Sequence, residues 1–157
     1  MATTATVKKS GYLAAETSVA GTVLDSITDN TWAALTAEIT NVSDLYLQAD
    51  LELVLGSASY ITPSDCGIEV YAIPTVDGTN YPTWTSGTTA DKPENNGFFV
   101  GYFTLTGTTA AQRAVIRDIE LPSGKFKFGF RNRGNVTLPA SGNTVKMRAN
   151  SYAGVTP

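Results

Sequence analysis

Apolar and polar side chains alternate along most of the chain, which is the pattern of β-strands with one buried face. The clearest run is Leu45–Leu55, where every second residue is Leu or Ala and the residues between them are mostly polar. An α-helix would distribute those leucines around its whole circumference. We therefore predict a strand here, with Leu47, Leu51 and Leu53 facing the core.

The same period of two predicts further strands along the chain. Turn residues separate the weaker run Trp32–Thr40 from Leu45–Leu55, and we expect these two runs to form a hairpin. In Phe98–Leu105 both faces are apolar, which is typical of a central strand that is covered on both sides. The other predicted strands are Gly11–Ala15, Gly67–Ile73, Ala114–Leu121, Lys125–Arg131 and Thr144–Ala149.

About eight short strands and no long helical pattern predict an all-β fold, a single-domain antiparallel β-sandwich of jelly-roll type. Residues 1–30 show little strand pattern, so we predict an N-terminal arm or weakly structured strand region there and the sandwich domain at 31–157. Besides the three leucines, the predicted core residues are Val70, Phe103, Ile119, Phe126, Phe128, Phe130 and Val145.

The 157-residue chain has no histidine and one cysteine, Cys66. It therefore lacks the commonest metal ligand and the base of Ser/His and Cys/His nucleophile pairs. No phosphate-binding glycine motif or Cys/His metal pattern occurs. Asp50 and Glu52 share one strand face, which suits either a glycosidase carboxylate or a solvated sheet surface. We predict a protein without catalytic residues, metal or cofactor, in which Cys66 is a small buried side chain.

Charge is distributed unevenly along the chain, whose formal net charge is −3. Residues 1–112 hold 3 Lys and Arg against 12 Asp and Glu, whereas residues 113–157 hold 8 against 2. This asymmetry indicates either charge pairing between neighbouring strands or docking on a charged partner surface. The negative total argues against nucleic-acid binding. If the last two strands pair, one basic stripe would consist of Lys125, Lys127, Arg131, Arg133, Lys146 and Arg148.

The first residues are polar and no apolar segment of signal-peptide type follows Lys8 and Lys9. No apolar run is long enough to span a membrane. We therefore expect synthesis in the cytoplasm and no membrane partner.

The segment from Pro74 to Asn96 is rich in Gly, Pro and Asn and is longer than most strand connections. Its aromatic residues Tyr81 and Trp84 have two interpretations. They bind a sugar or a partner protein, or they cover a sheet edge or fill a subunit contact.

Several stretches resemble a group of small virion structural proteins of tailed bacteriophages: EVYAIPTVDGTNY at 69–81, FVGYF at 99–103, IELPSGKFKF at 119–128, RNR at 131–133 and PASGNTVKMR at 139–148. The resemblance covers roughly residues 68–149, about half of the chain, and includes no chemical motif. It implies a β-sandwich decoration or cement protein that sits on the capsid exterior, commonly as a trimer at three-fold or quasi-three-fold positions.

Sequence and resemblance together predict a non-enzymatic decoration protein on the virion surface that binds the major capsid protein as a homotrimer. The alternative is a tail- or fibre-associated host-recognition module in which Tyr81 and Trp84, with Tyr60 and Trp32, contact carbohydrate, although Trp32 begins a strand and is expected to be buried. A generic assembly protein inside the virion is a third class. Candidate partner-contact residues are Lys8, Lys9, Tyr81, Trp84, Arg131 and Arg133.

Overall fold

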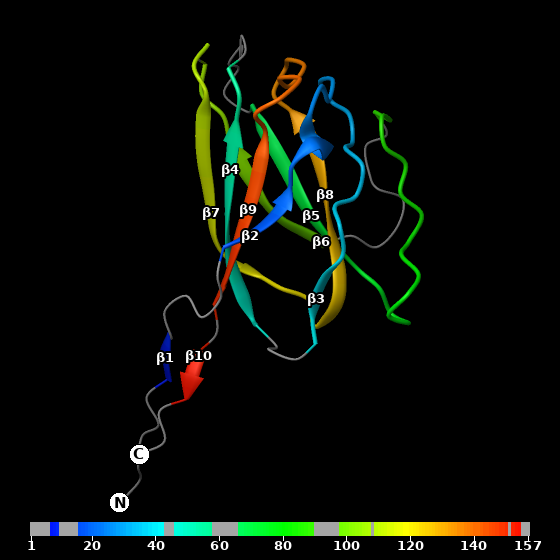
Figure 1. Ribbon diagram of the computed structural model, residues 1–157, viewed down its shortest axis with the longest axis vertical. Helices are drawn as coiled ribbons and strands as arrows, with labels where there is room; N and C mark the ends of the chain where they lie inside the picture. The colour runs from blue at the N-terminus through cyan, green and yellow to red at the C-terminus, as the bar shows by residue number, and fades with distance from the viewer. Residues whose placement is uncertain are drawn as a thin grey trace, which may run out of the picture.

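Eight strands form two four-stranded antiparallel sheets that pack face to face (Figure 1). The computed structural model describes residues 7–9, 16–42, 46–57, 66–89, 98–107, 109–150 and 152–154. The all-β sandwich predicted from the alternating pattern is therefore confirmed. The strand predicted at Gly11–Ala15 lies outside the described residues.

The two sheets are named here after their longest inner strands. The β4 sheet has the order β2-β9-β4-β7, and the β8 sheet has the order β3-β8-β5-β6. The β4 sheet consists of β2 (Thr17–Ala20), β9 (Thr144–Asn150), β4 (Gln48–Leu55) and β7 (Gln112–Glu120). The β8 sheet consists of β3 (Ile39–Asn41), β8 (Gly124–Arg133), β5 (Gly67–Pro74) and β6 (Phe98–Thr104).

The connectivity is that of a jelly roll. The chain crosses from one sheet to the other at every connection from β2 to β9 except the one between β5 and β6, and the first of these eight strands pairs with the last. The predicted hairpin between Trp32–Thr40 and Leu45–Leu55 is wrong, because β3 pairs with β8 and β4 lies in the opposite sheet. Turn residues end a strand, but they do not specify whether the chain returns to the same sheet or crosses to the other.

Two further strands lie outside the sandwich. β1 (Val7–Lys9) and β10 (Tyr152–Gly154) pair with each other and form a ribbon that extends away from both sheets (Figure 1). Within residues 1–30, predicted as an arm or a weakly structured strand region, β2 belongs to the β4 sheet, and Leu24, in the short 3-10 helix η1 (Thr22–Leu24), is buried in the core.

The core lies between the sheets and follows the alternation of the strands. β4 shows it most clearly, since each second residue from Ala49 to Leu55 is fully buried. Leu47 is 58% exposed, so its assignment to the core is wrong; it precedes the first paired residue of β4 and lies beyond the part of the strand that the other sheet covers. The other predicted core residues are all buried: Leu51, Leu53, Val70, Phe103, Ile119, Phe126, Phe128, Phe130 and Val145.

Strand β6 is an edge strand and not a central one, contrary to the prediction for Phe98–Leu105. Phe103 points into the core, but Phe98 and Phe99 are 41% and 57% exposed. The second apolar face of this strand therefore belongs to the outside of the β8 sheet.

Candidate interaction surface

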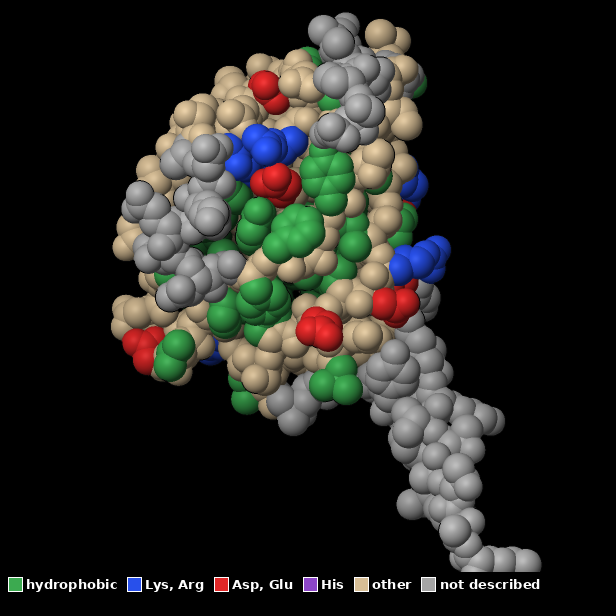
Figure 2. All heavy atoms as spheres, turned by 180° about the vertical axis from the view of Figure 1, so that it is seen from behind, with side chains coloured by type: hydrophobic (Ala, Val, Ile, Leu, Met, Phe, Trp, Pro, Cys, Tyr) green, Lys and Arg blue, Asp and Glu red, His purple; other side chains and the backbone are tan. Residues whose placement is uncertain are grey.

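The outer face of the β8 sheet carries a row of aromatic side chains. Trp84 contacts Trp32 with ring centroids 5.1 Å apart, Trp32 contacts Tyr71 at 5.2 Å, and Tyr71 contacts Phe99 at 5.5 Å. All three contacts are edge-to-face, the geometry that aromatic pairs prefer. Figure 2 shows hydrophobic side chains gathered in the middle of one face, with charged side chains around them.

Glycines on the strands below make room for aromatic rings on this face, in the row and beside it. An added Cβ at Gly129 of β8 would collide with the six-membered ring of Trp84, and one at Gly67 of β5 would collide with the ring of Tyr102. Gly129 occupies an outward position of β8, between the inward Phe128 and Phe130. A glycine inside a strand marks a site where another group approaches the backbone closely, and this is a signal in the sequence that could have identified the covered face.

The loop that carries Trp84 is tied to the sheet by hydrogen bonds. Trp84 donates from Nε1 to the carbonyl oxygen of Ala33 at 2.7 Å. The backbone N–H of Gly87 donates to the carbonyl of Trp32 at 2.8 Å, and that of Trp32 donates to the carbonyl of Thr88 at 3.2 Å. Trp84 is therefore half-buried and covers the sheet, which agrees with the interpretation as a covering residue and not with that as a free binding residue. Trp32 is buried, as expected.

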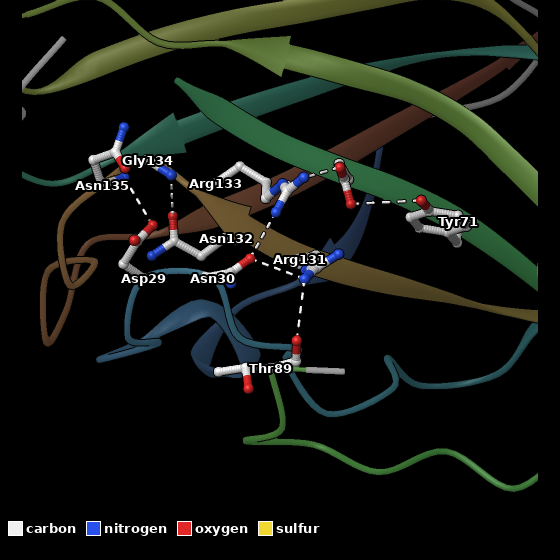
Figure 3. A network of polar contacts seen from close by, with 10 residues as sticks. Asp29, Asn30, Tyr71, Thr89, Arg131, Asn132, Arg133, Gly134 and Asn135 are labelled. Carbon is white, nitrogen blue, oxygen red and sulfur yellow. Dashed lines mark hydrogen bonds and ion pairs between the residues drawn. The ribbon is translucent and has the colours of Figure 1, made fainter. Parts of the chain in front are cut away.

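Two arginines of β8 form a polar network beside the aromatic row (Figure 3). Arg131 and Arg133 both donate to the side-chain oxygen of Asn30, at 2.9 and 2.7 Å. Arg133 also forms an ion pair with Glu69 at 3.2 Å, and the guanidinium carbon of Arg131 lies 5.1 Å from the centroid of the Trp32 ring. Arg131 is 2% exposed, so its assignment as a partner-contact residue is wrong: the guanidinium holds the loop segments together from inside.

Tyr81 belongs to a second polar cluster at the other end of the loop. Its hydroxyl donates to Glu38 at 3.0 Å, and Lys125 forms an ion pair with the same carboxylate at 3.0 Å. Lys127 lies 4.4 Å from the centroid of the Tyr81 ring. Partial burial, and secondly the hydrogen bond to Glu38, raise the pKa of Tyr81 to about 12. The hydrogen bond from Lys125, followed by that from Tyr81, lowers the pKa of Glu38.

The predicted basic stripe does not form, because β8 and β9 lie in different sheets. Lys146 of β9 pairs with Glu16 at 2.6 Å on the outside of the β4 sheet, opposite the face that carries Lys125 and Lys127. On that outside, Glu52 pairs with Arg113 at 2.6 Å, so it is part of an ion pair on the sheet surface.

The ion pairs described here explain the uneven charge distribution along the chain. Every one of them joins an acidic residue before position 112 to a basic residue after it. This is the internal charge pairing between neighbouring strands that the sequence left open beside docking on a partner. The pairs are Glu52 with Arg113, Asp50 with Arg117, Glu38 with Lys125, Glu69 with Arg133 and Glu16 with Lys146.

Cys66 is buried at the start of β5, as the sequence predicts. Its thiol donates to the carbonyl of Gly134 at 3.5 Å, and Asn135 donates to the sulfur at 3.3 Å. Within the described part of the chain, no group of three or more Asp, Glu or Cys residues is placed to hold a metal ion. None of the described segments forms a helix with the length and apolar character that crossing a bilayer requires.

The far end of this face is accessible. Phe99 closes the aromatic row with more than half of its surface exposed, and it is the residue that sequence reasoning missed. Tyr60 and the side chains of Lys8 and Lys9 lie outside the described residues. No protein-family model, curated protein or solved structure matches the chain.

Proposed function

We propose that this chain is a non-enzymatic structural protein of a tailed-bacteriophage virion, a decoration (cement) protein that binds the outer surface of the assembled major capsid protein shell as a homotrimer. The jelly-roll connectivity is the observation that carries the proposal, since viral capsid proteins use this architecture. The resemblance of residues 68–149 to virion structural proteins supports the same class.

Stabilisation of the shell follows from mass action. A protein that binds the assembled shell, and not its separate subunits, shifts the equilibrium towards the assembled state. The ribbon of β1 and β10 suits this role, because it lies outside both sheets and can reach a neighbouring subunit while the sandwich keeps its own contacts (Figure 1). Lys8 and Lys9 belong to this ribbon and remain candidate contact residues.

Carbohydrate recognition at the tail or fibre is the second candidate, because lectins also use jelly rolls. The observation that favours it is the exposed ring of Phe99 at the end of the aromatic row, next to Tyr71. A sugar would stack on this ring and not on Trp84, whose indole faces Gly129 and Trp32.

The test uses particles of the virus that encodes the chain, prepared with and without this protein. On the decoration proposal, purified chain rebinds to bare shells in hundreds of copies per particle and raises the temperature at which the shells release their DNA. Binding of only a few copies at the tail, or no change in shell stability at saturation, would overturn the proposal. In that case, binding of the chain to host surface glycans, and its loss on Phe99→Ala substitution, becomes the next measurement.

A further inference from the structure

The four edge strands of the sandwich differ sharply in how well they resist pairing with another chain. The edges are β2 and β7 in the β4 sheet and β3 and β6 in the β8 sheet. An exposed edge is a template for a further strand, and proteins blunt such edges with short strands, bulges, charged residues or a covering segment.

Three of the four edges are blunted in these ways. β2 has four residues and a register shift between Ser18 and Ala20. β3 has three residues, and the segment before it covers β8, with Ala33 and Thr36 donating to β8 carbonyls at 2.9 and 3.0 Å. β7 is long, but four of its nine residues are charged, and Asp118 has a φ of 54° beside a register shift in its pairing with β4.

β6 has a register shift in its pairing with β5, between Val70 and Tyr71, but it is neither very short nor charged. Its seven residues, FFVGYFT, include no charged residue and no proline, and among the described strands it pairs with β5 alone. Phe98 and Phe99, at the start of the strand, are 41% and 57% exposed. A long, uncharged and apolar edge of this kind is an association site in a soluble protein.

A hollow lies between the first half of β6 and the end of β7. Near Gly101 the two sheets touch, since an added Cβ there would come within 2.9 Å of Ile116 on β7. Towards Phe98 an open hollow of about 280 Å³ separates the two strands, and its lining includes Val100 and Ile119. Arg117, Asp118 and Glu120 of β7 lie around this hollow.

We propose that β6 pairs antiparallel with β6 of a second copy about a two-fold axis, so that two β8 sheets join into one continuous sheet. A two-fold contact brings the same surface patch together from both copies, so the patch must complement itself. β6 meets the electrostatic part of this condition, because it has no charged residue that would face its like. β7 paired with itself would oppose charged positions along much of its length.

The aromatic row also favours a second copy as the occupant. Phe99 ends the row at the edge of the sheet, and the partner sheet would bring its own Phe99 and Tyr102 beside it. Because β6 has only seven residues, we expect less buried area than the roughly 1,600 Å² of a standard protein complex, and therefore weak, concentration-dependent association. The contact goes beyond the proposed function, and it can link two monomers or two trimers.

The test is sedimentation equilibrium of the full chain over a wide range of concentration. We expect wild-type protein to show a two-fold increase in mass as the concentration rises, and Phe99→Lys to weaken this step at least about tenfold, because lysine would have to be desolvated at the contact. Val115→Lys is the matched control, since Val115 is an apolar side chain of β7 with 47% exposure that lies with Glu52 and Lys146 on the outside of the β4 sheet. It should leave the association unchanged.

Hydrogen exchange locates the contact independently of any variant. Amide protection that increases with concentration should be confined to residues 98–104. If Phe99→Lys fails to fold, Thr104→Lys, at the exposed other end of β6, replaces it. A mass that never doubles with concentration, or a doubling that is insensitive to substitution in β6, would overturn the inference, whether or not the chain binds a viral shell.

Discussion

The indole ring of Trp84 lies against the backbone of Gly129, at a distance that leaves no space for a side chain on that residue. The ring belongs to the loop and the glycine to β8, so this contact fixes the loop onto the sheet together with the hydrogen bond from Trp84 Nε1 to Ala33. Because Trp84 also packs against Trp32, the glycine indirectly sets the position of the whole aromatic row.

Replacing Gly129 with alanine should therefore displace Trp84. We expect a loss of about 1–3 kcal/mol in the free energy of unfolding, as for other substitutions that overfill a packed site, together with a red shift of the tryptophan fluorescence. Urea denaturation followed by fluorescence measures both effects. Trp84→Phe provides the control, because the phenyl ring is smaller than the indole ring that the added methyl group would meet.

The double variant tests whether the two residues act through one contact. Gly129→Ala should cost less in the Trp84→Phe background than in wild type, with a coupling of about 0.5–3 kcal/mol for residues in direct contact. Additive costs would mean that the glycine is required by the strand itself and not by the ring.

Most of the strands were predictable because the alternation of apolar and polar residues depends on the local structure of each strand. The strands at Leu45–Leu55 and Lys125–Arg131 bury one face each, and burial of one face is what produces a period of two. The pairing of the strands was not predictable in the same way. Trp32–Thr40 precedes a turn, and only the packing of two sheets decides that the chain crosses there.

The candidate surface was predictable only in part, for a related reason. Tyr81 and Trp84 stood out in a long loop, but their partners Glu38, Gly129 and Trp32 come from segments that only the jelly-roll fold brings together. The apolar outer residues of β6 suggested a central strand, because a sequence does not distinguish a face covered by another sheet from one left at an edge.

The two differently placed hydrophobic residues Phe128 and Leu47 allow a direct test of the core. Phe128 is fully buried and packs between the rings of Phe126 and Phe130, so Phe128→Ala should lower the free energy of unfolding by about 3–5 kcal/mol. Leu47 is 58% exposed, and Leu47→Ala should change it by no more than about 0.5 kcal/mol. Chemical denaturation of both variants decides the point; similar costs would contradict the assigned strand faces.

The raised pKa of Tyr81 predicts a loss of stability at alkaline pH. Its folded-state pKa, raised to about 12, lies above the value near 10 of an unfolded chain, so its contribution is complete below pH 10 and is lost as the pH rises towards 12. The reason is that the neutral hydroxyl donates to Glu38, whereas a phenolate would repel that carboxylate. Stability measured against pH should therefore fall less steeply above pH 10 in Tyr81→Phe than in wild type.

A spectrophotometric titration assigns this effect to one residue. Wild type should show one tyrosine that ionises near pH 12 and is missing from Tyr81→Phe. Tyr71→Phe is the comparison: burial, and secondly the charge of Glu69, raise the pKa of Tyr71, but its hydroxyl contacts Glu69 and not Glu38. Equal stability profiles for wild type and Tyr81→Phe would show that the hydrogen bond to Glu38 contributes nothing.

Acid should loosen the turn at the start of the same loop. Asp77 accepts hydrogen bonds from the backbone N–H groups of Thr79 and Asn80 and from the side chains of Thr75 and Asn80. These bonds, led by that from the Asn80 backbone, lower the pKa of Asp77, so its contribution is present above the unfolded value near 3.9 and is lost as the pH falls through the folded value. Hydrogen exchange at Thr79 and Asn80 should be faster in Asp77→Ala than in wild type at neutral pH, and unchanged protection would contradict this account.

The ribbon offers the sharpest test of how the chain would hold a viral shell. Among the described strands β1 pairs with β10 and with neither sheet, so deletion of residues 2–11 should leave the eight-stranded sandwich folded, with a melting temperature close to that of wild type. If the ribbon bridges capsid subunits, the deletion should abolish rebinding to bare shells. A second variant, with Lys8 and Lys9 both replaced by alanine, keeps the strand and removes its charge. Loss of binding in the deletion alone would assign the contact to the backbone of the ribbon, loss in both would assign it to the two lysines, and full binding by both would exclude the ribbon from the interface.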